Sequence, residues 1–265
     1  MAPVSLDQLP PAARQAWISL AAELHRILAD DLVAAWAHGG TTSVAEEPHP
    51  ADLDTYVILA RPPSPSSVEA IEAAHQALAR EHGVEWDAWY VLESDARGAD
   101  PPRHAFRRGS RDTSWAIQRA HWLAGRYVPL HGPAPDEIVQ APTEDELMTD
   151  LRRELEHIER HVLEGDTDSY EATYAILNGS RILHTLETGN AALSKAAAGR
   201  WALGRLPNRW HPALQAATRA YRGHASREDT ELLAAEMGSF VAFVRERLPL
   251  LDEREADELP RWSGY

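Results

Sequence analysis

Two aspartates at alternate positions, Asp52 and Asp54, stand at the start of a largely apolar segment that ends at Leu59. The alternation predicts a β-strand, in which side chains two residues apart share a face about 7 Å apart along the chain. Carboxylates this close repel each other, and a divalent cation that prefers oxygen ligands relieves the repulsion. Magnesium is the natural candidate, because it commonly links one or two carboxylates to nucleotide phosphates. The alternative is a polar turn before a buried strand, since short Asp-x-Asp motifs are common.

A turn rich in glycine and hydroxyl groups precedes these aspartates. It reads Gly39-Gly40-Thr41-Thr42-Ser43. Paired glycines let backbone amides approach a phosphate chain, and nearby hydroxyls add contacts. Gly40-Thr41, followed eleven residues after Thr41 by the Asp-x-Asp strand, resembles the glycine-serine loop and strand of the DNA-polymerase-beta-like nucleotidyltransferases. Thr41 stands where that family usually has Ser, and the resemblance implies that Gly40 and Thr41 bind the nucleotide.

A further strand, expected over residues 84–92, carries Glu85 and Asp87 on one face. Metal-dependent nucleotidyl transfer needs a carboxylate that binds a cation or accepts the proton of the attacking hydroxyl. Either acid can supply it, and simple surface exposure is the alternative for both. The streptomycin and spectinomycin adenylyltransferases, which this region resembles, have Glu where Asp87 stands. We therefore predict that Asp87 joins Asp52 and Asp54 as a catalytic and metal-binding residue.

The C-terminal half contains four separated motifs whose order and spacing resemble the helical domain of the same adenylyltransferases. They are residues 178–189, Ser194-Lys195, residues 200–207 and residues 221–223. The resemblance implies that Arg181, Lys195 and Tyr221 contact ATP. Lys195 is the only lysine of the chain, and a compact ammonium suits a triphosphate. The family's acidic residue near the start of the helix expected at residues 115–124 is not matched in place, because Asp112 lies slightly upstream of it.

A predicted acceptor site lies one helical turn and more before Arg181. The family places an acidic residue there that recognises the amino groups of the antibiotic, and Glu171 stands near that position, with Tyr174 on the same polar helix face. Charge complementarity favours a cationic acceptor. The loop over residues 93–112 contains no Trp, whereas streptomycin-modifying members of the family use one in that region.

Composition limits the partners of the chain. Its 265 residues carry a net charge of -15, are 44% hydrophobic and include no Cys. The acidic balance argues against binding to nucleic acid, which requires a basic surface, and the absence of Cys excludes disulfides and thiolate chemistry. No apolar run approaches the roughly 20 residues of a membrane span, and the N-terminus has no signal-peptide pattern. We expect a monomeric cytoplasmic protein without a membrane partner.

Periodicity and capping signals predict an α+β N-terminal domain followed by an all-α domain. The resemblance implies that the first is a nucleotidyltransferase domain, with a small mixed sheet and helices, and that the second is a helical bundle. A Pro-rich segment at residues 133–142 separates them. The expected domains are residues 1–135 and 143–250, with a tail at 251–265. Helices are expected at residues 5–29, 66–82, 115–124, 143–163, 168–188 and 226–248, and strands at residues 32–37, 52–59 and 84–92.

These patterns indicate an enzyme that transfers AMP from ATP, with Mg²⁺, to a hydroxyl of a small cationic acceptor such as an aminoglycoside or aminocyclitol antibiotic. Two alternatives remain open. One is a catalytically weak nucleotide-binding or regulatory protein of the same fold, which the replacements at Thr41 and Asp87 motivate. The other is an active transferase whose acceptor is not an antibiotic.

Overall fold

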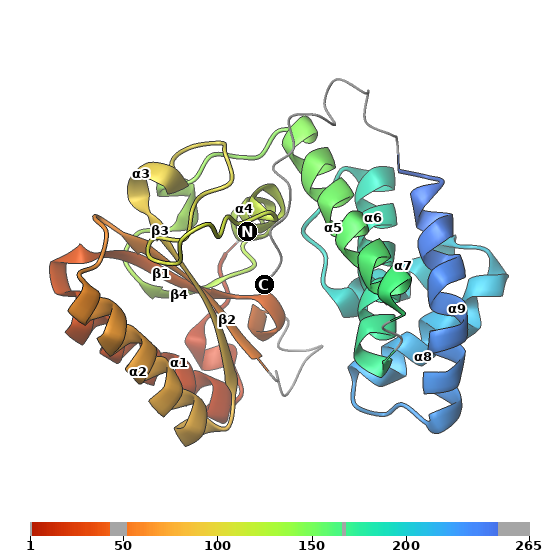
Figure 1. Cartoon of the computed structure of the whole chain (residues 1–265), viewed down its shortest axis with the longest axis horizontal. Helices are drawn as coiled ribbons and strands as arrows, with labels where there is room; N and C mark the ends of the chain where they lie inside the picture. Colours follow the sequence, from red (N-terminus) through yellow and green to blue (C-terminus); the bar gives the residue numbers. More distant parts are fainter. Residues whose placement is uncertain (1, 43–51, 166–167, 249–265) are drawn as a thin grey trace.

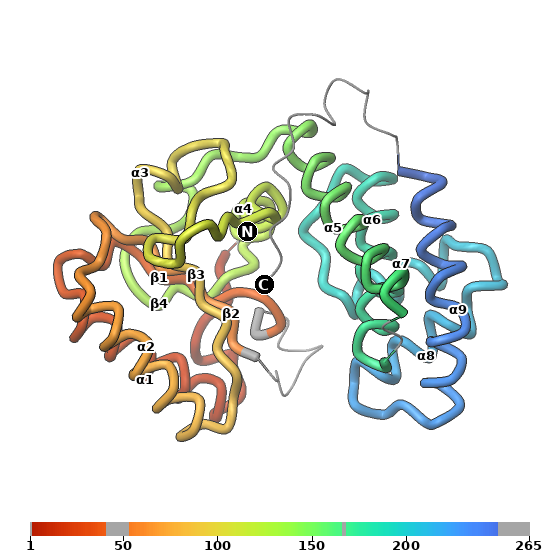
Figure 2. Tube along the Cα trace, viewed as in Figure 1, coloured from red at the N-terminus to blue at the C-terminus, as the bar shows by residue number. Residues whose placement is uncertain are grey.

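The computed structural model describes residues 2–42, 52–165 and 168–248. Figure 1 shows two regions side by side: a sheet with helices formed by the N-terminal half, and a bundle of helices formed by the C-terminal half. The tube in Figure 2 shows the chain passing from the first region to the second once, between β4 and α5. The predicted fold class, a small mixed sheet with helices followed by a helical region, is confirmed.

The sheet of the N-terminal region contains four strands in the order β3-β2-β1-β4. β1 pairs antiparallel with both β2 and β4, whereas β2 and β3 are parallel. The parallel pair requires a crossover, which the helix α2 supplies. The strands are β1 (Leu32–His38), β2 (Asp52–Leu59), β3 (Glu85–Leu92) and β4 (Val128–His131).

Helices pack on both faces of this sheet, so its central strands are almost wholly apolar. On one face, α1 (Pro11–Leu28) buries Trp17 and Leu20, and α2 (Pro65–His82) buries Ile71, in one cluster with Val57. On the other face, α4 (Trp115–Leu123) brings two tryptophans onto Trp36 and Tyr56. The second face also carries the polar residues described below.

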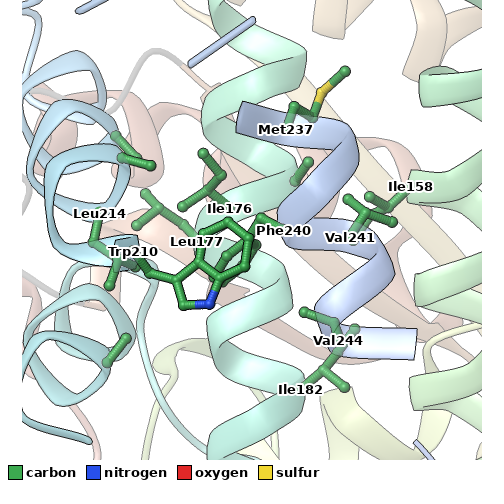
Figure 3. Packing of buried hydrophobic residues seen from close by; sticks show 14 of the residues in the cluster. Ile158, Ile176, Leu177, Ile182, Trp210, Leu214, Met237, Phe240, Val241 and Val244 are labelled. Carbon is green, nitrogen blue, oxygen red and sulfur yellow. The ribbon is translucent and has the colours of Figure 1, made fainter. Parts of the chain in front are cut away.

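The C-terminal bundle has its own apolar core. α6 lies at its centre and contacts α7, α8 and α9, and Figure 3 shows Trp210 beside Phe240, with ring centroids 5.1 Å apart. Gly179 lets α6 and α9 approach closely, because a Cβ there would lie 3.0 Å from the Phe240 ring. The helices are α5 (Glu144–Glu164), α6 (Ser169–Thr188), α7 (Lys195–Arg205), α8 (His211–Tyr221) and α9 (Arg227–Arg245).

Three local predictions are wrong in detail. The first helix begins at Pro11 rather than residue 5, after a separate short 3-10 turn at Leu6–Gln8. The second helix is capped by Ser64, whose side chain accepts the Ser67 N–H, so Ser66 already lies inside the helix. The loop over residues 93–112 contains a short helix, α3 (Glu93–Ala96). The domain boundaries stay a prediction, and the expected tail lies outside the described residues.

The two regions meet along α4 and α5. The Asp150 carboxylate of α5 accepts the backbone N–H groups of Ala116 and Ile117, at 2.7 and 3.3 Å, and so caps the first turn of α4. Arg119, fully buried on α4, bonds Glu146 of α5 at 2.5 Å. α4 therefore contacts both the bundle and the sheet.

Among the helices in the described part of the chain, none is both long and apolar enough to cross a bilayer.

The contacts between α4 and α5 predict that the free energy of unfolding depends on pH. Burial, with the nearby Asp112 adding to it, raises the pKa of Asp150 to about 7 from an ordinary 3.8. The folded state therefore binds the proton more tightly than the unfolded state, and stability falls as pH rises from about 4 to 7. Asp150→Asn keeps an oxygen acceptor but cannot ionise. We expect this variant to exceed the wild type in free energy of unfolding by a margin that widens over that range, reaching roughly 1–4 kcal/mol at pH 7.

Urea denaturation at several pH values measures this margin. The control is Asp145→Asn, because Asp145 is exposed in the first turn of the same helix. The free energy of unfolding of Asp145→Asn should change with pH as that of the wild type does. A constant difference between Asp150→Asn and wild type from pH 4 to 7 would contradict the assignment of the proton to Asp150.

Candidate active site

Three neighbouring strands place His38, Asp54 and Asp87 in one row. His38 pairs with Asp54 across β1 and β2, and Asp54 pairs with Asp87 across β2 and β3. Residues in register on adjacent strands share a face about 5 Å apart, so the two carboxylates are neighbours. Asp54 is half-buried and Asp87 is exposed. The structure thus brings together two of the three predicted metal-binding aspartates.

Gly39 closes the row at the end of β1. Its φ is +67°, and a Cβ built on it would lie 1.7 Å from Oδ2 of Asp54. Only glycine leaves space for that carboxylate against the turn. The next residues form the 3-10 turn Gly39–Thr42, which places Gly40 beside the start of the row. The side chain of Thr41, the residue Ser43 and the side chain of Asp52 lie outside the described residues, although the Asp52 backbone pairs with Glu85.

A buried tyrosine and a third carboxylate lie beneath the row. The Tyr56 hydroxyl donates to Oδ2 of Asp112, and Oδ1 of Asp112 accepts the Ser114 N–H at 2.8 Å. Burial raises the pKa of Asp112 to about 6, and Asp87 adds to the effect. Burial, Asp112, Asp87 and Asp54 together raise the pKa of Tyr56 well above its usual range. Asp112 therefore lies close to the row of carboxylates, although in the sequence it lies slightly upstream of the position at which the family has its acidic residue.

This donor set fits a hard divalent cation. Asp54 and Asp87 offer carboxylate oxygens, the ligands that Mg²⁺ prefers, and their electrostatic effect on Tyr56 shows that their negative charges act on one small volume. Within the described side chains, no group of three Asp, Glu, His or Cys residues is arranged to hold a metal. A magnesium ion would complete its coordination with water and phosphate oxygens, as it usually does.

The helical bundle brings together Lys195, Tyr174 and Tyr221. Nζ of Lys195 lies 4.8 Å from the ring centroid of Tyr174 and 5.8 Å from that of Tyr221, within the range of cation–π attraction. Lys195 is the first residue of α7, and Ser194 caps that helix. Tyr174 donates its hydroxyl to Glu154 of α5 at 2.9 Å. The predicted nucleotide-binding and acceptor-binding residues of the bundle thus share one surface.

Arg181 connects this surface to the sheet region. Its Nη1 donates to Oδ1 of Asn178 at 3.0 Å, and its Nη2 lies 2.8 Å from Nε2 of His121 on α4. The positive charge of Arg181 also acts on Tyr174. His38, which pairs with Asp54, lies beside the same helix, with its ring centroid 6.2 Å from that of Trp122. α4 therefore lies against both Arg181 and the strand end that carries the row.

Glu171 has a set of neighbours that no sequence motif marked. Its carboxylate lies 3.8 Å from Nδ1 of His161, and both Glu171 and Glu154 act electrostatically on His157. Sequence reasoning missed Glu154, His157 and His161 as members of the site. They recur at three- and four-residue steps along residues 144–164, a spacing that could have shown that they share a helix face.

Two comparisons relate the chain to known proteins. Residues 138–247 match the family model of the aminoglycoside adenylyltransferase C-terminal domain. The C-terminal part of the chain is therefore similar to that domain of the aminoglycoside adenylyltransferases. The resemblance found in the sequence is confirmed, and so is the prediction of a nucleotidyltransferase enzyme. No curated protein matches the chain.

A solved structure shows that the likeness in fold extends beyond that domain. The spectinomycin adenyltransferase AAD(9) from Enterococcus faecialis, crystallised with ATP and spectinomycin, superposes with a TM-score of 0.67. The match covers 88% of this chain and 98% of the other, at 14% sequence identity. At this identity, the shared property is the fold, including the sheet region that the family model does not cover.

The Gly39 turn gives a test of the row of carboxylates. Gly39→Ala would force a methyl group into the space of the Asp54 carboxylate, so we expect MgATP affinity to fall at least tenfold. Gly83→Ala is a matched control, because Gly83 has nearly the same φ, +65°, with nothing within 4 Å of a built Cβ. Both variants pay the cost of a left-handed alanine, about 1–2 kcal/mol.

Isothermal titration calorimetry with MgATP and thermal unfolding measure the two effects separately. Equal MgATP affinity in the two glycine variants would show that the position of Asp54 does not matter for nucleotide binding.

Proposed function

We propose that the chain is a magnesium-dependent adenylyltransferase that transfers AMP from ATP to a hydroxyl of a small cationic acceptor. One observation carries the proposal. Neighbouring carboxylates on β2 and β3 lie on the sheet face that α4 covers, and α4 reaches Arg181 of the bundle through a 2.8 Å contact. This packing supports a site in which the carboxylates bind magnesium and Arg181 binds phosphate, because α4 lies against both the sheet face and Arg181.

The nucleotide would be held from both regions. Arg181 and Lys195 supply positive charge for the β- and γ-phosphates, and Tyr221, beside Lys195, packs at the nucleotide. Gly40 and Thr41 lie on the turn next to Asp54, where backbone N–H groups can meet phosphate oxygens. Arg181 has hydrogen-bonding partners that fix its guanidinium without neutralising it.

The carboxylates would carry the chemistry. Asp52 and Asp54, with Asp87, would hold magnesium, which when bound neutralises phosphate charge and favours in-line displacement. The exposed Asp87 would orient the acceptor hydroxyl and accept its proton as the oxygen attacks the α-phosphorus of ATP. The bond between that phosphorus and the bridging oxygen then breaks, and pyrophosphate leaves. The positioning of the two substrates supplies much of the rate enhancement.

The acceptor surface is acidic and favours an amine. Glu154 accepts the Tyr174 hydroxyl and Glu171 lies beside His161, and a cationic acceptor would form ion pairs with these carboxylates. Spectinomycin, the antibiotic crystallised with AAD(9), is an acceptor of this chemistry. We propose an aminocyclitol of that kind, recognised by Glu171 and Tyr174.

The first test is product formation. Incubation of the protein with ATP, Mg²⁺ and spectinomycin or a panel of aminoglycosides should add one AMP to the acceptor, as detected by mass spectrometry. Asp87→Asn should lower kcat by 10²–10⁴-fold, the usual loss on removing a general base, whereas Glu85→Gln should retain most activity. If Glu85→Gln were the inactive variant, the base would be Glu85, as the sequence alone allowed.

Binding of MgATP without any product, across the panel, would instead support the nucleotide-binding or regulatory alternative. Adenylylation of a hydroxyl compound outside the antibiotics would support the alternative acceptor.

A second test concerns the order of binding. Because the proposed nucleotide ligands come from both the sheet region and the bundle, MgATP should bind first and bring the acceptor surface towards Asp87. We expect the affinity for the acceptor, measured by calorimetry, to rise at least tenfold when the protein is saturated with Mg²⁺ and an ATP analogue whose α,β-linkage cannot be hydrolysed. Acceptor affinity that does not change with the nucleotide would contradict this order.

A further inference from the structure

We propose that His121 is a positioning residue that aims Arg181 and fixes the segment leading to Lys195. The inference rests on the proposed function, because it assigns His121 to the binding of MgATP. It concerns a residue that neither the sequence motifs nor the matched family domain contains, since His121 lies on α4, before residue 138.

The protonation state of His121 follows from its partner. An arginine can only donate hydrogen bonds, so Nε2 of His121, 2.8 Å from Nη2 of Arg181, must accept and carry no proton. Burial, and next the positive charge of Arg181, lower the pKa of His121 well below its ordinary value. The ring is therefore neutral, and its proton resides on Nδ1.

The second ring nitrogen ties α4 to the loop between α6 and α7. His121 makes a hydrogen bond to the backbone of Ala191, for which the protonated Nδ1 is the available donor. Ala191 lies four residues before Lys195, and its carbonyl also accepts the Leu193 N–H at 3.0 Å. One imidazole thus contacts Arg181 directly and holds the segment that precedes Lys195.

The contacts of Arg181 leave it ready for a phosphate. A guanidinium has five N–H donors, and here His121 and Asn178 each take one. Both acceptors are neutral, so they fix the direction of the side chain and leave its charge in place. In the described part of the chain no carboxylate pairs with Arg181, so its charge and its remaining donors can bind the triphosphate. A carboxylate in the place of His121 would hold Arg181 equally well but would cancel that charge.

Contacts with α5 and with the core hold α4, and therefore His121, in place. Asp150 caps its first turn, Arg119 joins it to α5, and Trp122, next to His121, is fully buried in the core above the sheet. Movement of His121 relative to the carboxylate row would require α4 to leave that core. The distance from Arg181 to the row is therefore set by packed secondary structure rather than by two flexible side chains.

Three substitutions test the assignment. His121→Gln places an amide oxygen near the Nε2 position, so it can still accept from Arg181. His121→Asn is shorter and retains only a group near Nδ1. His121→Leu removes both contacts. Calorimetry with MgATP should give a Kd within about threefold of wild type for Gln, and a Kd raised at least tenfold for Asn and Leu. His25→Leu, an exposed histidine on α1, is the control and should bind as wild type does.

A double-mutant cycle separates positioning from a general structural role. In an Arg181→Gln background, His121→Asn should raise the Kd for MgATP less than twofold, because the arginine that His121 positions is already absent. Equal losses in both backgrounds would overturn the inference. So would a His121→Asn variant that binds as tightly as wild type. If His121→Leu does not fold, the comparison of Gln with Asn still decides the question.

The outcome for wild type distinguishes the two proposals. Wild-type protein that binds no MgATP would refute the proposed function, and the inference with it. Wild-type protein that binds MgATP and forms product, together with an unaffected His121→Asn variant, would refute the inference alone.

Discussion

Mutual repulsion among carboxylates is the constraint on which the site depends. Asp54 and Asp87 are neighbours on adjacent strands, and Asp112 lies below them in the core. Backbone hydrogen bonds of the sheet hold Asp54 and Asp87 together in spite of their charge, and the Gly39 turn leaves no room for Asp54 to move aside. Protonation partly relieves the buried Asp112, whose pKa rises to about 6. A divalent cation, as proposed above, would relieve the repulsion between Asp54 and Asp87 and would also assist phosphoryl transfer.

α4 converts this local arrangement into a two-sided site. Its first turn is capped by Asp150 of α5, and its last turn presents His121 to Arg181 of α6. The same helix covers the sheet face that carries the carboxylates. A single rigid element therefore relates the negative charges of the sheet to the positive charges of the bundle.

Features that depend on neighbouring residues in the sequence were predictable, and features that depend on distant ones were not. The caps at Thr143 and Ser226 form as their side-chain spacing predicts. β4 was missed because it has four residues, includes Pro129, and exists only through its pairing with β1. Pro129 is tolerated because β4 is an edge strand.

The same division applies to the site. Asp54 and Asp87 stand on strands with clear alternation, so their shared face could be inferred. His121 and Glu154 gain their roles from contacts with Arg181 and Tyr174, residues far away in the sequence. No period or motif marks such contacts, because the partner lies on another helix. Asp112 is an intermediate case: its place near α4 was visible, but its hydrogen bond to Tyr56 was not.

The acidity of the chain bears on how the side chains of Lys195 and Arg181 are held. A protein with a net charge of -15 repels a triphosphate over most of its surface, so the few cations at the site must keep their charge. Aromatic rings contact Lys195, and neutral acceptors contact Arg181. Neutral acceptors do not cancel the charge of Arg181, whereas arginines elsewhere, such as Arg219 and Arg245, pair with carboxylates. This difference supports the proposal that Arg181 binds a ligand, whereas Arg219 and Arg245 stabilise the fold.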